Sequence, residues 1–65
     1  MTAAKFLRIC GFKDRDFPPN IGDYRIELDA DVVCLQRGSK TVGRFSERGV
    51  NPRCVLARIR QDCGQ

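Results

Sequence analysis

Carboxylates in residues 14–31 are the side chains whose type and spacing best fit a binding chemistry. Apolar and charged residues alternate from Tyr24 onward, which is typical of a strand with one buried face. In an extended strand Glu27, Asp29 and Asp31 would point to one side, about 6.6–6.8 Å apart. Such a row could imitate the phosphates of a nucleic acid and bind a basic surface on another protein. The candidates for binding a protein partner are Asp14, Asp16, Asp23, Glu27, Asp29 and Asp31.

Arginines in the second half of the chain favour an alternative chemistry, the direct binding of nucleic acid, since arginine neutralises phosphate and can bind it in a bidentate way. Phe45 is the only aromatic residue of that half, whereas proteins that bind single strands usually offer several stacking rings. No RNP motif, zinc finger or clear helix-turn-helix accompanies the arginines. The candidates are Arg44, Arg48, Arg53, Arg58 and Arg60. Arg37 and Lys40 lie on the same predicted hairpin as Arg44.

The charge is unevenly distributed along the chain. Residues 1–31 carry five basic and six acidic residues, a net charge of −1, and residues 32–65 carry seven and two, a net charge of +5. Within residues 14–31 alone the net charge is −4. Such asymmetry indicates a charged partner. A third interpretation stays open, in which the charges keep the protein in solution and pair with one another.

Four cysteines, at positions 10, 34, 54 and 63, are the remaining reactive groups. Free buried thiols, one or two disulfides and a four-cysteine zinc site are all compatible with this number. The gaps of 23, 19 and 8 residues contain no C-x-x-C pair, and the chain has no histidine, the commonest metal ligand and general base. We therefore expect no metal site, no cofactor, no catalytic residues and no enzymatic activity.

Length and composition set the scale of the domain that must position these groups. The chain has 65 residues, of which 42% are hydrophobic and 31% charged, so residues 1–65 form one domain too apolar to be disordered. A chain this short rarely encloses a cleft that desolvates reacting groups. No apolar run approaches the roughly 20 residues of a membrane span, and no secretory signal begins the chain. We expect a cytoplasmic monomer.

The elements that these patterns predict form an α+β domain. Residues 5–12 are predicted to be a strand, with a short helix as the alternative, and residues 13–22 a loop that Phe17 pins to the core. Residues 24–34 are predicted to form one long strand or two short ones, with Tyr24, Ile26, Leu28, Ala30, Val32 and Cys34 facing inward.

A hairpin is predicted over residues 32–45, with Gly38-Ser39 in a type II′ turn. This register pairs Arg37 with Lys40, Leu35 with Val42, and Val32 with Phe45, while Gly43 indicates a bulge or a close approach by another element.

A helix is favoured over residues 52–63, with a last strand as the alternative. Asn51 would cap this helix, Pro52 would be its first residue and Gly64 would follow its end. The expected sheet is antiparallel with three to four strands, packed against this C-terminal helix; a five-stranded barrel is the alternative.

The whole chain resembles the small anti-CRISPR inhibitors of type I systems, which phages and mobile elements encode. The resemblance covers the overall size, the strand-plus-helix layout and the stretch Phe17-Pro18-Pro19-Asn20-Ile21-Gly22-Asp23-Tyr24. It implies a non-enzymatic inhibitor that binds a subunit of a CRISPR surveillance complex in the host cytoplasm and blocks access to target DNA. The acidic segment agrees with the DNA mimicry of many such inhibitors, and the basic half departs from it.

Overall fold

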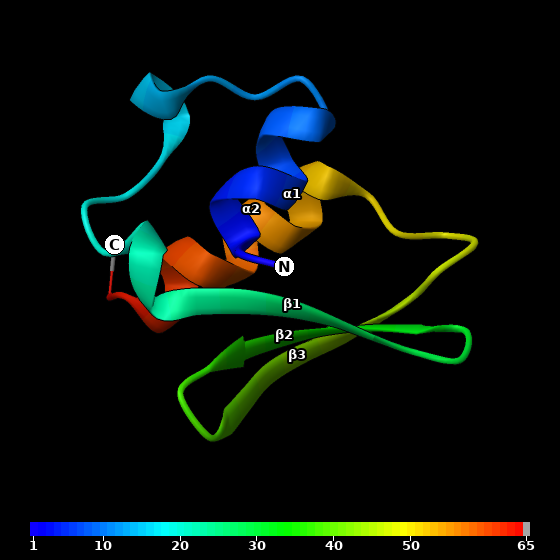
Figure 1. Cartoon of the computed structure of the whole chain (residues 1–65). Coiled ribbons are helices and arrows are strands. Elements are labelled where there is room, and N and C mark those ends of the chain that lie inside the picture. The colour runs from blue at the N-terminus through cyan, green and yellow to red at the C-terminus, as the bar shows by residue number, and fades with distance from the viewer. Residues whose placement is uncertain (65) are drawn as a thin grey trace.

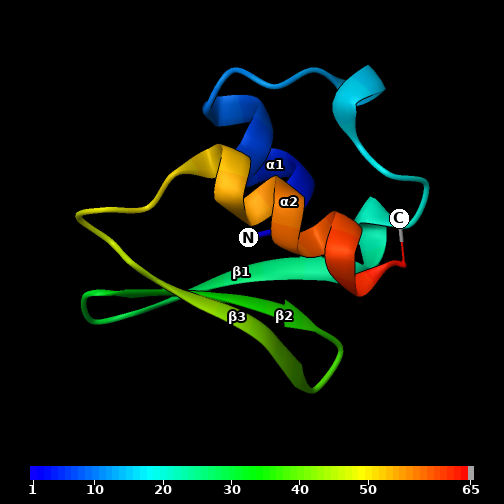
Figure 2. The same cartoon turned by 180° about the vertical axis from the view of Figure 1, so that it is seen from behind.

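The computed structural model describes residues 1–64 and has two layers. Two helices cover one face of a three-stranded antiparallel sheet of order β1-β2-β3, and the other face is left uncovered by any described element (Figure 1; Figure 2). The predicted α+β class with a C-terminal helix is confirmed, and the five-stranded barrel is wrong. The helices and strands are α1 (Ala3–Ile9), β1 (Tyr24–Asp29), β2 (Val32–Arg37), β3 (Lys40–Ser46) and α2 (Pro52–Asp62).

The predicted first strand is wrong, because α1 occupies most of that segment. Thr2 caps the helix by accepting a hydrogen bond from the N–H of Lys5 at 3.1 Å, and two alanines at the helix start favour helical backbone. Ala3 and Leu7, four residues apart, are completely buried on one helical face. A short apolar run fits a strand and a helix equally well, and here the N-terminal cap decides for the helix.

The connection from α1 to β1 is a loop, as predicted, with two short 3-10 turns at Asp14–Asp16 and Ile21–Asp23. The first turn is closed by Asp16, whose carboxylate accepts a hydrogen bond from the N–H of Lys13 at 2.9 Å. Phe17 packs against the core, which confirms its predicted role. The loop passes along the outer side of the helices before the chain enters the sheet (Figure 1).

Residues 24–34 form two strands rather than one, separated by a turn at Ala30-Asp31. Ala30 adopts a φ of +54°, a left-handed conformation that costs an L-residue about 1–2 kcal/mol. The turn ends the predicted alternation of inward and outward residues. On β1 the inward positions Tyr24 and Ile26 are buried, whereas Leu28 is 65% exposed.

On β2 the buried positions are Val33 and Leu35, not the predicted Val32 and Cys34, which are half-buried. The reason is geometric: the tight two-residue turn brings β2 back antiparallel, so Val33 lies opposite Leu28 and Leu35 opposite Ile26. Residues that face each other across the strands share a face of the sheet, and the even-numbered pattern therefore ends at the turn.

The β2–β3 hairpin has the predicted turn. Gly38 has a φ of +61° while Ser39 is not at positive φ, the pattern of a type II′ turn. Arg37 pairs with Lys40 as predicted.

Beyond that pair the predicted register is wrong by one residue, because the register shifts and leaves Val42 as the extra residue of a bulge. Leu35 pairs with Gly43, Val33 with Phe45 and Val32 with Ser46. A Cβ on Gly43 would lie 3.3 Å from the Phe45 ring and 3.4 Å from Cγ of Arg58. Both the bulge and the close approach inferred from this glycine are therefore confirmed.

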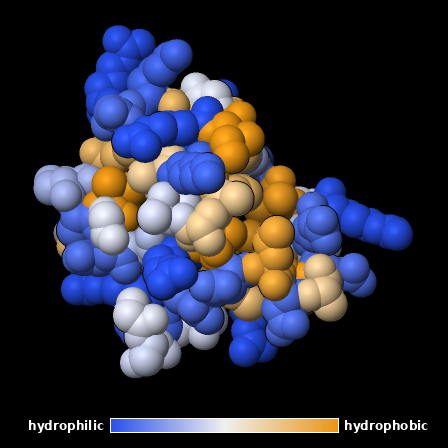
Figure 3. Space-filling view, in the orientation of Figure 1, coloured by the Kyte–Doolittle hydropathy of each residue, from blue (hydrophilic) through white to orange (hydrophobic). Residues whose placement is uncertain are grey.

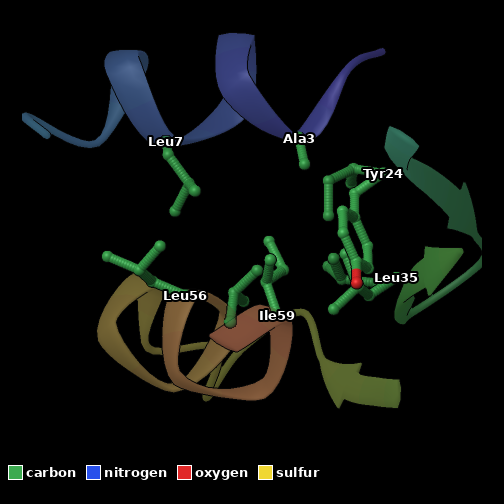
Figure 4. Packing of buried hydrophobic residues seen from close by; sticks show 9 residues of the cluster. Ala3, Leu7, Tyr24, Leu35, Leu56 and Ile59 are labelled. Atoms are coloured by element: carbon green, nitrogen blue, oxygen red, sulfur yellow. The ribbon is translucent and has the colours of Figure 1, made fainter. Parts of the chain in front are cut away.

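The C-terminal helix is confirmed and the alternative of a last strand is wrong. The Asn51 side chain accepts a hydrogen bond from the N–H of Arg53 at 2.9 Å, and Pro52 opens the first turn. Gly64 follows the helix with a φ of +80°, which glycine adopts readily. In Figure 4 side chains of α1 and α2 point toward one another, and Tyr24 and Leu35 from the sheet close one side of this core; the labelled residues are Ala3, Leu7, Tyr24, Leu35, Leu56 and Ile59.

Candidate functional site

A cluster of polar side chains joins the sheet to the end of α2, where β1 begins and the β2–β3 hairpin turns. The hydroxyl of Tyr24 donates to Oδ2 of Asp62 at 2.7 Å. Arg37 contacts the same oxygen at 3.2 Å, and Nζ of Lys40 lies 3.3 Å from Oδ1. These three contacts satisfy the carboxylate of Asp62, whose side chain is only 12% exposed. We call this region, with Asn20 and Cys63, the polar end.

Cys63 extends the polar end to the loop before β1. Its thiol donates to Oδ1 of Asn20 at 2.9 Å, and its sulfur lies 3.2 Å from the hydroxyl of Tyr24. The ring of Tyr24 also lies under the guanidinium of Arg37, 6.0 Å from its centre. The contacts therefore join three segments that are far apart in the sequence: the 3-10 turn region, the hairpin and the C-terminal helix.

These contacts change the acidity of the groups involved. The hydrogen bond from Tyr24, with those from Arg37 and Lys40, lowers the pKa of Asp62 from its ordinary value of 3.8, although burial opposes the change. Burial, followed by the hydrogen bonds with Cys63 and Asp62, raises the pKa of Tyr24 well above 10.0. The pKa of Arg37 is also raised, chiefly by its hydrogen bond to Asp62. At neutral pH the phenol is therefore a hydrogen-bond donor rather than a base, and the polar end braces the fold.

An apolar groove lies at the opposite end of the sheet, between α1, the end of β1 and the connection from β3 to α2. Its volume is about 260 Å³, and its apolar lining includes Met1, Phe6, Ile9, Leu28, Val33 and Val50. Three of these side chains are largely in solvent: Met1 is 45%, Leu28 65% and Ile9 70% exposed. Hydrophobic side chains gather on this face of the molecule in Figure 3.

The six predicted acidic residues do not form one surface. Asp14 is paired with Arg8 at 2.7 Å, Asp16 closes its own turn, and Asp23 lies at the end of the second 3-10 turn, next to β1. Glu27 lies on the uncovered face of the sheet, 3.6 Å from Arg25. The predicted row of Glu27, Asp29 and Asp31 is wrong, because β1 ends at Asp29 and Asp31 belongs to the turn.

One member of the predicted set, Asp31, lies next to an acidic residue that the sequence interpretation missed. The carbonyl of Asp31, in the turn before β2, accepts a hydrogen bond from the N–H of Glu47 at 2.7 Å. Both residues are exposed, and Glu47 lines the apolar groove. Asp29 ends β1 and follows the alternation of Glu27, on the side of the sheet away from the groove. We call Asp31 and Glu47 the acidic lip.

The alternative arginine set is divided between three places. Arg44 lies on β3, Arg48 lies in the following turn, and all five side chains are exposed. Arg53, Arg58 and Arg60 share the helix α2 but not one side of it. Arg53 and Arg60 lie toward the loop after α1, where Arg60 donates to the backbone carbonyl of Asp16 at 2.8 Å. Arg58 lies over β3, with its Cγ 3.4 Å from the position of a Cβ on Gly43. The five arginines therefore do not form one continuous basic surface.

The four cysteines are free thiols, so the disulfide alternative is not the state of this structure. Cys10 and Cys54 are exposed, contrary to the interpretation as buried thiols. Cys10 follows the last residue of α1, and Cys54 lies on the solvent side of α2. Within residues 1–64, no three cysteine, aspartate or glutamate side chains lie close enough together to hold a metal ion.

Both regions rest on contacts that sequence reasoning did not find. Asp62 was not singled out, and its partner Tyr24 lies 38 residues away. The groove was missed because residues 5–12 were predicted to be a strand, which hides the position of Ile9. One signal was available: on a helical wheel Ile9 falls away from the face shared by Ala3 and Leu7, so a helix here predicts an exposed isoleucine.

Comparison with protein-family models, curated proteins and solved structures finds no match to this chain. In the part of the chain that the structure describes, neither helix has the length and apolar character needed to cross a bilayer.

Proposed function

We propose that the chain is a non-enzymatic protein-binding domain that docks through the apolar groove and inhibits its partner by occlusion. The observation that supports this is the exposure of Met1, Ile9 and Leu28 around one hollow. A single exposed apolar side chain is ordinary, but neighbouring ones around a concave surface are typical of interaction sites. Leaving them in water has a cost that burial against a partner removes.

The target we propose is a nucleic-acid-binding subunit of a CRISPR surveillance complex, met in the host cytoplasm. The resemblance to the type I inhibitors supports this target, and the acidic lip beside the groove agrees with a surface that normally binds nucleic acid. Of the predicted acidic residues, the proposal keeps Asp31 as a contact. Bound there, the chain would prevent target DNA from reaching the complex.

The experiment is capture of proteins from host lysate on the full chain carrying a carboxyl-terminal tag, followed by mass spectrometry. Wild type is compared with Leu28→Asp, which places a charge in the groove at an exposed position, and with Thr41→Asp, the same change at an exposed position of β3. We expect a protein that the Leu28 variant loses and the Thr41 variant retains. A partner that both variants retain equally contradicts docking through the groove.

The inhibitory step is measured with a purified type I surveillance complex and labelled target DNA in a gel-shift assay. We expect wild type and Thr41→Asp to prevent the shift of the labelled DNA. The variant Leu28→Asp should have no effect on that shift. An unaffected shift in the presence of wild type, for a complex that the chain binds, contradicts inhibition by occlusion.

The arginines of α2 support a second candidate function, direct binding of nucleic acid. Arg53, Arg58 and Arg60 are exposed, and the ion pairs of residues 1–64 include none of them. Binding through phosphates should weaken steeply as salt rises. A gel shift of labelled DNA or RNA by the chain alone, lost in the triple Arg→Glu variant, would support this function, and no shift at low salt would dismiss it.

A further inference from the structure

A cleft lies between α2 and the loop that follows α1. One part of it has a volume of about 320 Å³, and its lining residues are Phe12, Asp16, Arg53, Leu56, Ala57 and Arg60. A second part, of about 310 Å³, begins at Cys10 and shares Phe12 and Arg53 with the first. Each volume is at the lower limit of ligand pockets, which measure roughly 300–1,000 Å³. We call the two adjoining parts the loop–α2 cleft.

Two arginines of α2 line this cleft. Arg53 and Arg60 are seven residues apart in the helix, so they point to one side of it, about 10.5 Å apart along the axis. The guanidinium of Arg60 is held beside the loop by a hydrogen bond to the carbonyl of Asp16 at 2.8 Å. Neither arginine belongs to an ion pair of residues 1–64. Ala57 lies between them, and its small side chain leaves room for a ligand.

The charge around the cleft is positive when the neighbouring acidic groups are counted. The loop residues 13–16 carry two basic and two acidic side chains, and Arg8 at the end of α1 pairs with one of these carboxylates at 2.7 Å. With Arg8 and the two arginines of the cleft, five positive and two negative charges give a net charge of +3. Residues 47–48, on the connection into α2, carry opposite charges, and Asp23 lies near Arg37 at the polar end. A polyanion is therefore attracted to the cleft.

Phe12 places an aromatic ring in the same cleft. It lines both parts and is half-buried against the core, so the ring is held in place while part of it stays open. Proteins that bind single strands contact phosphates with basic side chains and stack bases on aromatic rings. A duplex keeps its bases inside the helix, and an acidic peptide would use the arginines alone. The combination of ring and arginines therefore favours an unpaired nucleotide.

From the arginines, the net charge and the ring we infer that the loop–α2 cleft binds single-stranded nucleic acid. Arg53 and Arg60 bind phosphates, and Phe12 stacks on an unpaired base. The inference rests on the second candidate function and names its site and the form of its ligand. It does not depend on docking through the apolar groove.

The first test is fluorescence anisotropy of a labelled single strand of about 12 thymidines, added to the full chain. Arg53→Gln with Arg60→Gln should weaken binding at least about tenfold. The slope of log K against log salt should fall in magnitude by about 1.4, since each phosphate contact contributes about 0.7. Arg44→Gln with Arg48→Gln removes the same charge from β3 and the following turn, and should bind like wild type. Equal weakening by the two double variants overturns the inference.

The second test concerns the ring and the space beside it. Phe12→Trp gives the chain its only indole, whose fluorescence should be quenched by the single strand but not by a duplex of the same length. Ala57→Glu adds a carboxylate between the arginines at an exposed position, and should weaken binding at least about tenfold without disturbing the core. Binding without quenching, or binding that ignores Ala57→Glu, overturns the inference.

Other results separate this site from the proposed functions. A peptide of 12 glutamates that binds as tightly as the single strand, and loses binding in the same double variant, would mean that the ligand is an acidic protein segment and that the inference is wrong. Binding of nucleic acid that needs Arg58 but neither arginine of the cleft rejects this site and keeps the second candidate function. No binding at low salt rejects both. Leu28→Asp should bind the single strand like wild type, so docking through the groove is judged by its own experiment.

Discussion

The two ends of the sheet differ in how many of their side chains are buried or hydrogen-bonded within the fold. At the polar end the carboxylate of Asp62 has three partners, and the ring of Tyr24 is fully buried beneath them. At the groove end Leu28, only four residues further along the same strand, is 65% exposed. One end therefore stabilises the fold, and the other holds apolar surface that contributes little to it. The difference teaches that stabilising contacts and exposed apolar surface are separated along a strand of six residues.

The largest expected effect compares two apolar residues on the inward side of β1. Ile26→Ala should lower the free energy of unfolding by about 2–5 kcal/mol, because the side chain is buried and its removal leaves a cavity. Leu28→Ala should change it by less than about 0.5 kcal/mol, since solvent already surrounds most of the side chain. Urea denaturation followed by circular dichroism measures both. Equal losses would mean that the groove end is part of the core.

The next effect tests the hydrogen bond between Tyr24 and Asp62 at the polar end. Tyr24→Phe keeps the buried ring and removes the hydroxyl, leaving Asp62 without its closest donor. A hydrogen bond to a charged group contributes about 1.5–3 kcal/mol, so unfolding should become easier by about that amount. Leu28→Ser, a polar change at the groove end, is the matched control and should stay near wild type. A Tyr24 variant as stable as wild type would remove the distinction between the two ends.

A pH titration sharpens the comparison further. The pKa of Asp62 is lowered in the folded protein from its ordinary value of 3.8, so its contribution to stability is present above that value. The contribution is lost as the pH falls below 3.8 through the lower folded pKa. The stability difference between wild type and Asp62→Asn should therefore narrow on acidification. Asp31→Asn at the groove end is the control, and the same narrowing there would contradict the assignment.

The smallest effect concerns the two hairpin turns, one at each end. Ala30 at the groove end has a φ of +54° and Gly38 at the polar end a φ of +61°. Ala30→Gly removes left-handed strain but adds freedom to the unfolded chain, for a net gain of about 0.5 kcal/mol. Gly38→Ala, with nothing within 4 Å of the new Cβ, should lose a similar amount through φ alone. Thermal melts of both variants measure this, and shifts of the same sign would contradict it.

Local signals predicted much of the fold. Asn51-Pro52 predicted the start of α2, Gly38-Ser39 predicted the hairpin turn, and Gly43 predicted the bulge, because each depends on neighbours in the sequence. The segment of α1 was assigned wrongly since its apolar residues fit both periodicities, and the deciding contact is a single side-chain cap at Thr2.

The candidate site could be predicted much less well, for a physical reason. The exposure of Leu28 depends on how far α1 extends over the sheet, and the acidic lip depends on a backbone contact between Asp31 and Glu47. Neither the position of α1 over the sheet nor this backbone contact follows from spacing along the chain. The charge pattern correctly predicted that Asp29 and Asp31 are exposed. It also predicted a straight row of carboxylates, which the turn at Ala30 interrupts.

The pairing of Met1 with Ile26 has a practical consequence for handling the protein. Because this pairing is antiparallel, any residues joined ahead of Met1 would continue along β1 toward Leu28 and lie beside the groove. An affinity tag or fluorescent label fused there would occupy the surface that the binding experiments measure. Helix α2 ends at the opposite, polar end of the sheet, so a fusion that follows it is expected to leave that surface open. Comparing the two fusion sites provides a competition assay without a second molecule.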